Sequence, residues 1–191
     1  MIAKGSLPMV IIPIVFMVAT LIFRFYPITI LMVILLCFLL YFFRDPERIP
    51  SGTGVLSPAD GLVVQADGRN VGIYMNLMNV HVNRAPLDGE VIEIKRFRGS
   101  FKPAYRAEAK NNARTVITVK TEFGLMEVTQ IAGVLVRRIV CYLKVGDQII
   151  RGQRIGLVRF GSQVEVILPE GFTISASKED KVKAGRDVIA V

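Results

Sequence analysis

The chain has 191 residues, of which 52% are hydrophobic, and a net charge of +8, which allows one ordinary domain plus an appendage. This basic charge does not indicate a nucleic-acid binder, because the chain has no long block of like charges and no basic residues interleaved with base-stacking aromatics. Two cysteines, Cys37 and Cys141, are too few for a disulfide framework. These two distant cysteines and a single histidine do not form a usual zinc site.

The N-terminal residues 1–43 contain no acidic side chain and only two basic ones, Lys4 and Arg24. Two apolar runs, Leu7–Phe23 and Ile28–Phe43, predict a hydrophobic helical hairpin. Neither run has a polar face to turn towards water, so a membrane anchor is favoured over a buried core hairpin. Both runs are shorter than the roughly 20 residues that comfortably span hydrocarbon, so a spanning pair and a hairpin within one leaflet both stay open.

The two ends of such a hairpin emerge on the same side of the membrane. Lys4, Arg44 and Arg48 lie at that end, and Arg24 lies at the turn. Because cytoplasmic segments carry the excess of lysine and arginine, we expect a cell-membrane protein whose second domain is cytoplasmic.

Residues 44–191 are predicted to form that second domain, which begins with an extended linker over Phe43–Pro50. No stretch of 51–191 sustains a helical period, and short β-branched runs recur between turn residues. The expected strands are Gly61–Gln65, Val71–Met75, Val91–Phe97, Thr115–Lys120, Leu125–Ile131, Leu135–Leu143, Gln148–Ile150, Arg154–Arg159, Val164–Leu168 and Asp187–Ala190. The predicted fold class is therefore mainly β, a compact barrel or sandwich.

Residues 144–156 resemble the hairpins of biotinyl and lipoyl domains, so the predicted domain contains lipoyl-like hairpins. Those domains carry their cofactor on a lysine at a hairpin tip, typically beside a methionine. This chain has no Met-Lys pair, so the resemblance indicates architecture and no carrier function.

Three short stretches carry the candidate chemistry: Ser57–Gly61 with Asp60, Asn79–Pro86 with the single histidine His81, and Arg159–Val166 with the step Gly161-Ser162. Each stretch alone has an ordinary structural explanation as a turn, a polar core residue or a tight connection. Together they allow a Ser-His-Asp hydrolase, but the second glycine and the following helix of a nucleophile elbow are missing.

Seven co-linear motifs between about residue 42 and residue 170 resemble the short form of the phosphatidylserine decarboxylase family, which includes archaetidylserine decarboxylases. The motifs are Phe42-Phe43-Arg44-Asp45-Pro46, Ser57-Pro58-Ala59-Asp60-Gly61, Val80-His81-Val82-Asn83-Arg84-Ala85-Pro86, Gly99-Ser100-Phe101, Gln130-Ile131-Ala132-Gly133, Arg137-Arg138-Ile139-Val140 and Phe160-Gly161-Ser162. Any one of them would be weak, and their order and spacing make the resemblance specific.

The resemblance implies a proenzyme that cuts its own backbone between Gly161 and Ser162, so that the N- and C-terminal chains stay together as a heterodimer. Ser162 would become a pyruvoyl group that binds the substrate amine as a Schiff base, with no metal and no pyridoxal phosphate. His81 would act as the base and Asp60 would orient it, and these two with Ser162 are the candidate catalytic residues.

One position departs from the pattern of longer family members, which carry a second histidine where this chain has Arg84. It therefore stays open whether His81 serves self-cleavage, decarboxylation or both. Arg84 could bind the phosphate or carboxylate of the substrate through its planar fork, or form a structural salt bridge.

The function implied is decarboxylation of a membrane phospholipid, phosphatidylserine or archaetidylserine, to the matching ethanolamine-headed lipid. The alternative is a non-catalytic, membrane-tethered, lipoyl-like adaptor. The sequence does not distinguish ester-linked from ether-linked lipids, and exposed strand edges leave a further homo-oligomer open.

Overall fold

The computed structural model describes residues 1–100, 111–133, 139–159 and 162–191. The chain divides into two units, Met1–Pro46 and Glu47–Val191, each described separately below.

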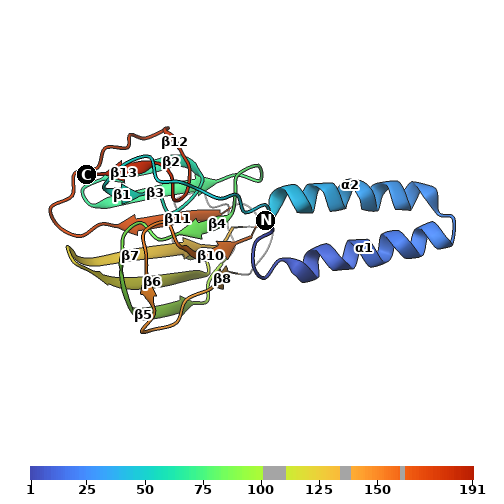
Figure 1. Cartoon of the computed structure of the whole chain (residues 1–191), viewed down its shortest axis with the longest axis horizontal. Helices are drawn as coiled ribbons and strands as arrows, with labels where there is room; N and C mark the ends of the chain where they lie inside the picture. Colours follow the sequence, from blue (N-terminus) through green and yellow to red (C-terminus); the bar gives the residue numbers. More distant parts are fainter. Residues whose placement is uncertain (101–110, 134–138, 160–161) are drawn as a thin grey trace. The chain divides into compact units, whose positions relative to one another are not determined.

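The first unit is a pair of antiparallel helices, α1 (Leu7–Ile22) and α2 (Tyr26–Phe42) (Figure 1). At the turn between the helices, the Thr29 hydroxyl donates to the Thr20 hydroxyl at 3.0 Å. At the other end, the Ala3 N–H donates to the Phe43 carbonyl at 2.8 Å. The predicted helical hairpin is confirmed. Within the described residues, no helix combines the length and the apolar character needed to cross a membrane.

In the second unit, the described residues form thirteen antiparallel strands in three sheets. Their bounds are Val55–Leu56 (β1), Gly61–Asp67 (β2), Asn70–Met75 (β3), Val82–Arg84 (β4), Gly89–Phe97 (β5), Arg114–Thr121 (β6), Gly124–Ile131 (β7), Ile139–Cys141 (β8), Gln148–Ile149 (β9), Arg154–Val158 (β10), Ser162–Ile167 (β11), Lys181–Val182 (β12) and Val188–Ala190 (β13).

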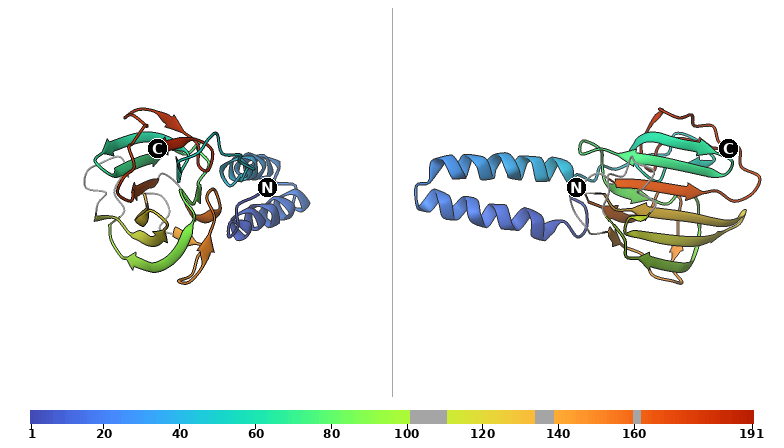
Figure 2. Two further views of the ribbon diagram at one scale, coloured as in Figure 1. Left: turned by 60° about the vertical axis from the view of Figure 1, so that its left-hand side comes forward. Right: turned by 180° about the vertical axis from the view of Figure 1, so that it is seen from behind.

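Eight strands form the large sheet, in the order β12-β2-β3-β11-β7-β6-β5-β9. The sheet curls into a partial barrel, which the two views of Figure 2 show from different sides. Strands β4, β10 and β8 form a second sheet in that order, and β1 and β13 form a third. The mainly β prediction is therefore confirmed.

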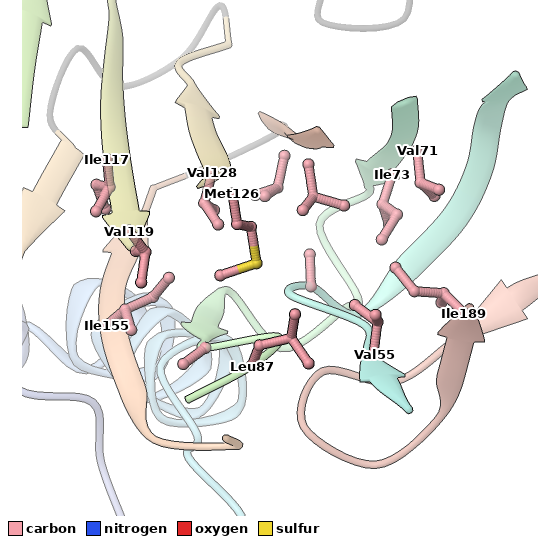
Figure 3. Close-up of a cluster of buried hydrophobic side chains, with 14 of the residues drawn as sticks. Val55, Val71, Ile73, Leu87, Ile117, Val119, Met126, Val128, Ile155 and Ile189 are labelled. Carbon is pink, nitrogen blue, oxygen red and sulfur yellow. The ribbon is translucent and has the colours of Figure 1, made fainter. Parts of the chain in front are cut away.

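The core of this unit lies between the three sheets, where alternate residues of each strand point inward. Ile117 of β6 and Met126 of β7 face Ile155 of β10, Val55 of β1 and Ile189 of β13 (Figure 3). All five side chains are almost fully buried. The small sheets thus supply the apolar side chains that close the curled sheet.

Three short strands were not predicted, namely β1, β4 and β12. Each has only two or three residues, too few for a period-2 pattern to be visible. In the predicted strand Leu135–Leu143, residues 135–138 lie outside the described residues and Ile139–Cys141 forms β8.

The lipoyl-like segment 144–156 contains two turns, at Gly146 (φ 93°) and Gly152 (φ 83°). Its strand β9 pairs with β5, whereas β10 pairs with β4 and β8. The segment therefore carries the chain from the large sheet to the second sheet, and its strands pair with other strands rather than with each other.

Gly61 generates a stability prediction, because a Cβ atom there would overlap the backbone carbonyl of Tyr74 on the neighbouring strand. We expect Gly61→Ala to lower the free energy of unfolding by about 1–3 kcal/mol, the usual cost of overpacking. Gly52→Ala is the matched control, since its added Cβ would meet the nearest atom, a Val188 methyl carbon, at 3.8 Å. Equal stability of the two variants in chemical denaturation would contradict the prediction.

Candidate functional site

Ser162 is the first residue of β11 and is fully buried. It is the register partner of Met75 in β3, and β11 pairs with β7 on its other side. Val164 and Val166 of the same strand belong to the core, so Ser162, two residues before Val164, faces the interior as well. Its hydroxyl has no hydrogen-bond partner among the described residues. The other half of the predicted cleavage site, Gly161, lies outside the described residues.

A buried hydroxyl without a partner costs free energy, of the order of 1–3 kcal/mol, so such a group calls for an explanation. A reacting hydroxyl provides one, because a nucleophile that is not held by another acceptor can approach its target.

His81 lies directly before β4 and is fully buried. Its Nδ1 atom is 2.9 Å from the carbonyl oxygen of Asn79. A carbonyl oxygen only accepts hydrogen bonds, so this contact assigns the proton of the neutral ring to Nδ1. The lone pair is then on Nε2, which is the atom that can take a proton.

Two buried amides bring the segment of His81 close to the start of β11. Gln130 of β7 donates from Nε2 to Oδ1 of Asn83 at 2.7 Å. Asn83 in turn makes a weak contact from Nδ2 to the sulfur of Met75, at 3.8 Å. Since β7 and β3 flank β11, this amide pair crosses over β11 and places β4 above its first residues.

Asn83 and Gln130 were noticed in the sequence only as members of motifs. Their common signal is a polar residue inside an otherwise buried strand, where it must find a partner. The Oε1 atom of Gln130 is buried and has no hydrogen-bond partner among the described residues.

Asp60 is buried in the turn before β2, where the Ser57 hydroxyl donates to the Ala59 carbonyl at 2.7 Å. Its Oδ2 atom forms an ion pair with Arg48 at 2.9 Å, and both side chains are nearly buried. Its Oδ1 atom accepts a hydrogen bond from the Ala184 N–H at 2.8 Å. Arg48, which the sequence indicated only as a linker residue and as a basic residue at the end of the hairpin, is thus bound to Asp60.

The described bonds tie Asp60 to Arg48 and Ala184, and the Nδ1 atom of His81 to Asn79. The orientation of His81 by Asp60 remains a prediction.

Arg84 is buried, and its Nη1 atom donates to the Gly152 carbonyl at 3.0 Å. Gly185 packs against the aliphatic part of this side chain, where a Cβ would overlap it. Its proposed contact with substrate likewise remains a prediction.

Cys141 is a poorer candidate nucleophile than Ser162. Burial raises the pKa of its thiol above the ordinary value, which reduces the thiolate that would react. No three histidine, cysteine, aspartate or glutamate side chains gather as metal ligands in the part of the chain that the structure describes.

Comparison with known proteins defines the class. The family model described as phosphatidylserine decarboxylase matches residues 35–190. A protein of Methanococcoides burtonii named as an archaetidylserine decarboxylase proenzyme is 46% identical over 155 residues, which cover 80% of this chain and 74% of the relative. A phosphatidylserine decarboxylase proenzyme of Streptomyces griseus is 47% identical over 152 residues, which cover 77% of this chain and 71% of the relative.

Both relatives are named as decarboxylase proenzymes. The chain belongs to the phosphatidylserine decarboxylase family. The match includes Asp60, His81, Arg84 and Ser162, and the family resemblance found in the sequence is confirmed.

The site generates a prediction about His81 and Asp60. We expect His81→Ala to slow self-cleavage by about 10²–10⁴-fold, the usual loss when a general base is removed. Asp60→Asn should slow it as well, because the carboxylate charge is lost while an acceptor for the Ala184 N–H is kept. The measurement is the fraction of chain cleaved with time in a denaturing gel.

Arg48→Met is the matched control, since it breaks the same ion pair and keeps the Asp60 carboxylate. If the Asp60 carboxylate acts on His81, self-cleavage should be slower in Asp60→Asn than in Arg48→Met. Equal rates would assign Asp60 an anchoring role only, and near-normal cleavage of His81→Ala would remove His81 from the mechanism.

Proposed function

We propose that this protein decarboxylates a serine-headed phospholipid to the ethanolamine-headed lipid, with a pyruvoyl group that it makes from its own Ser162. The observation that carries the proposal is the buried hydroxyl of Ser162, which has no hydrogen-bond partner within the described residues, at the start of a strand that pairs on both sides. The names of the relatives, which include both phosphatidylserine and archaetidylserine decarboxylase proenzymes, support the substrate class.

The first step is self-cleavage. The Ser162 oxygen attacks the carbonyl carbon of Gly161, the peptide C–N bond breaks, and an ester forms while the released nitrogen takes a proton. Loss of the Cα proton of Ser162 then expels the Gly161 carboxylate. The resulting enamine tautomerises, and water replaces the nitrogen, which leaves as ammonia. The products are a carboxylate at residue 161 and a pyruvoyl group at residue 162.

The residues around Ser162 have defined tasks in this scheme. His81 would accept the hydroxyl proton at Nε2, the atom left basic by the contact of Nδ1 with Asn79. The ion pair of Asp60 with Arg48 would hold the adjoining turn in place, and Asp60 would orient His81. Burial of Ser162 would keep competing water away from the ester.

The pyruvoyl ketone supplies an electron sink, since it condenses with the substrate amine as a Schiff base and takes up the electron pair released with carbon dioxide. Pyridoxal phosphate and metal are therefore not needed in this proposal. Arg84 is the candidate for binding a phosphate or carboxylate oxygen.

The two pieces should stay together after the cut. The piece 162–191 contributes β11, β12 and β13, and these strands pair with β3 and β7, with β2, and with β1 of the larger piece. Both cysteines belong to the larger piece, so the association needs no disulfide. A heterodimer held by strand pairing and a shared core follows, and a further homo-oligomer is compatible with it.

We also propose that the protein lies at the cell membrane, with its helical hairpin as anchor and its β unit on the cytoplasmic side. The hairpin exposes many large apolar side chains, among them Phe16, Leu21, Ile30 and Ile34. Such an apolar surface suits lipid rather than water.

Cleavage is the first test of the function. The expressed chain should yield a piece of residues 1–161 and a piece of 30 residues beginning at position 162, both visible by intact mass under denaturing conditions. Ser162→Ala should remain a single, inactive chain, whereas Ser177→Ala, an exposed control in the same piece, should cleave normally. An intact chain with full activity would refute the mechanism, and an intact chain without activity would favour the adaptor.

The reaction itself gives the next prediction. The cleaved protein should release carbon dioxide from phosphatidylserine or archaetidylserine without added pyridoxal phosphate or metal. Choline- and glycerol-headed lipids should be inert, because they have no primary amine beside a carboxylate. Hydroxylamine should abolish the activity by capturing the ketone. Activity that survives hydroxylamine and needs pyridoxal phosphate would contradict the pyruvoyl assignment.

Membrane attachment can be tested by deleting residues 1–43. The β unit has its own core, so the shortened chain should fold, cleave itself and leave the membrane fraction. Its activity on bilayer lipid should fall much more than its activity on a short-chain substrate. A shortened chain that still sediments with membranes would show that the hairpin is not the anchor.

A further inference from the structure

A cavity of about 380 Å³ opens at one edge of the large sheet, where β12, β2 and β3 run side by side. Lys181, Leu62 and Tyr74 are in register across these three strands, and all three line it. Its lining also includes Asp60 and Asn79.

The charges around this cavity leave an excess of positive charge. Its two acidic side chains are both engaged, Asp60 with Arg48 and Asp187 with Arg186, at 2.9 Å and 2.6 Å. Lys181 and Lys183, which also line the cavity, are exposed and make no ion pair within the described residues. Two uncompensated ammonium groups at a cavity favour an anionic ligand.

The loop on the other side of the cavity offers further donors. The Asn76 N–H donates to Oδ1 of Asn79, and the Met78 N–H donates to Oδ1 of Asn76, both at 2.9 Å. Because both side-chain oxygens accept bonds from the loop itself, the two amide groups have their N–H donors left for a ligand. Both asparagines line the cavity, so their amide groups add donors to its two lysines.

The cavity adjoins the residues proposed to act in catalysis. Asp60 is one of its walls, and the carbonyl of Asn79, another wall, holds the ring of His81. Asn76 directly follows Met75, the last residue of β3 and the register partner of Ser162, so the cavity reaches the strand end at which Ser162 begins β11. Leu62 and Tyr74 line it from the face of the sheet opposite to Met75 and Ser162.

The same loop carries two apolar side chains at its tip, Leu77 and Met78, which are 37% and 60% exposed. A cationic cavity beside exposed apolar side chains matches a ligand that has a phosphate near its head and hydrocarbon next to it. A phospholipid has this structure.

We propose that this cavity is the subsite for the phosphodiester of the lipid substrate, with Lys181 and Lys183 as the charged groups and the amides of Asn76 and Asn79 as further donors. The inference rests on the proposed function and deepens it, since it names the residues that would select a phosphate-bearing serine over free serine. The lysines bind and position the substrate and take no part in bond breaking.

The test is binding of glycerophosphoserine, which has the complete headgroup and no hydrocarbon chains. The protein is the full chain in zwitterionic detergent, with the substitution Ser162→Ala to prevent turnover. The method is titration calorimetry. We expect K181Q/K183Q to weaken binding by at least about tenfold, as for the loss of charge-assisted hydrogen bonds. The matched control is K144Q/K178Q, which removes two exposed lysines that do not line the cavity.

A second measurement uses the cleaved enzyme with a short-chain substrate. KM should rise by a similar factor in K181Q/K183Q, with kcat within about twofold, because the contacts hold ground state and transition state alike. This arm decides the matter if headgroup binding to the uncleaved chain is too weak to titrate.

The possible outcomes separate failure of the subsite from failure of the proposed function. Equal losses of affinity in K181Q/K183Q and K144Q/K178Q would indicate an effect of overall charge. Unchanged affinity and KM in K181Q/K183Q would exclude a contact between these lysines and the phosphodiester. If only binding to vesicles of anionic lipid falls, the lysines serve bilayer attachment. Lysine-dependent binding of glycerophosphoserine to a protein without decarboxylase activity would refute the proposed function and keep the subsite. If the enzyme is an active decarboxylase and its KM is the same in K181Q/K183Q, the subsite alone is refuted.

Discussion

Strand β11 is hydrogen-bonded on both sides, to β3 and to β7, and the proposed cleavage site lies at its first residue. Ser162 itself is in register with Met75 of β3, the pairing with β7 begins at the next residue, Gln163, and the Ser162 side chain is buried in the interior. The double pairing of β11 also explains how a chain could be cut there without falling apart, since the bonds of β11 to its neighbours do not depend on the peptide bond before it. The same strand would thus position the reacting group and retain the smaller piece.

The C-terminal segment around Ala184 and Gly185 also holds candidate residues in place. Asp60 accepts a bond from Ala184, and Gly185 packs on the Arg84 side chain, so this segment touches two of the candidate residues. The ion pair of Asp60 with Arg48 is nearly buried, and loss of one partner from such a pair typically costs about 3–5 kcal/mol. Residues from the linker, from the turn before β2 and from the C-terminal segment therefore depend on each other. This distribution suits a proenzyme, because residues on both sides of the cut complete the site.

Much of the fold followed from local patterns. The helical hairpin and the long strands β5, β6 and β7 are visible as apolar runs and as β-branched alternation between turn residues. Asp60, His81 and Ser162 stood out by residue type and motif. The contacts around them could not be found in this way, because Arg48 reaches Asp60 from the linker and Gln130 reaches Asn83 from a distant strand, and both contacts form only in the folded chain. The short strands β1, β4 and β12 were missed for the same reason, since pairing rather than local propensity forms them.

The central claim is that the substrate reacts on residue 162 itself. The most direct measurement is mass spectrometry of the 30-residue piece after borohydride is added during turnover with phosphatidylserine. Reduction should fix the lipid amine covalently to this piece, and fragmentation should place the added mass at position 162. A piece that stays unmodified while carbon dioxide is released, or a lipid trapped on a lysine of the larger piece, would contradict the account.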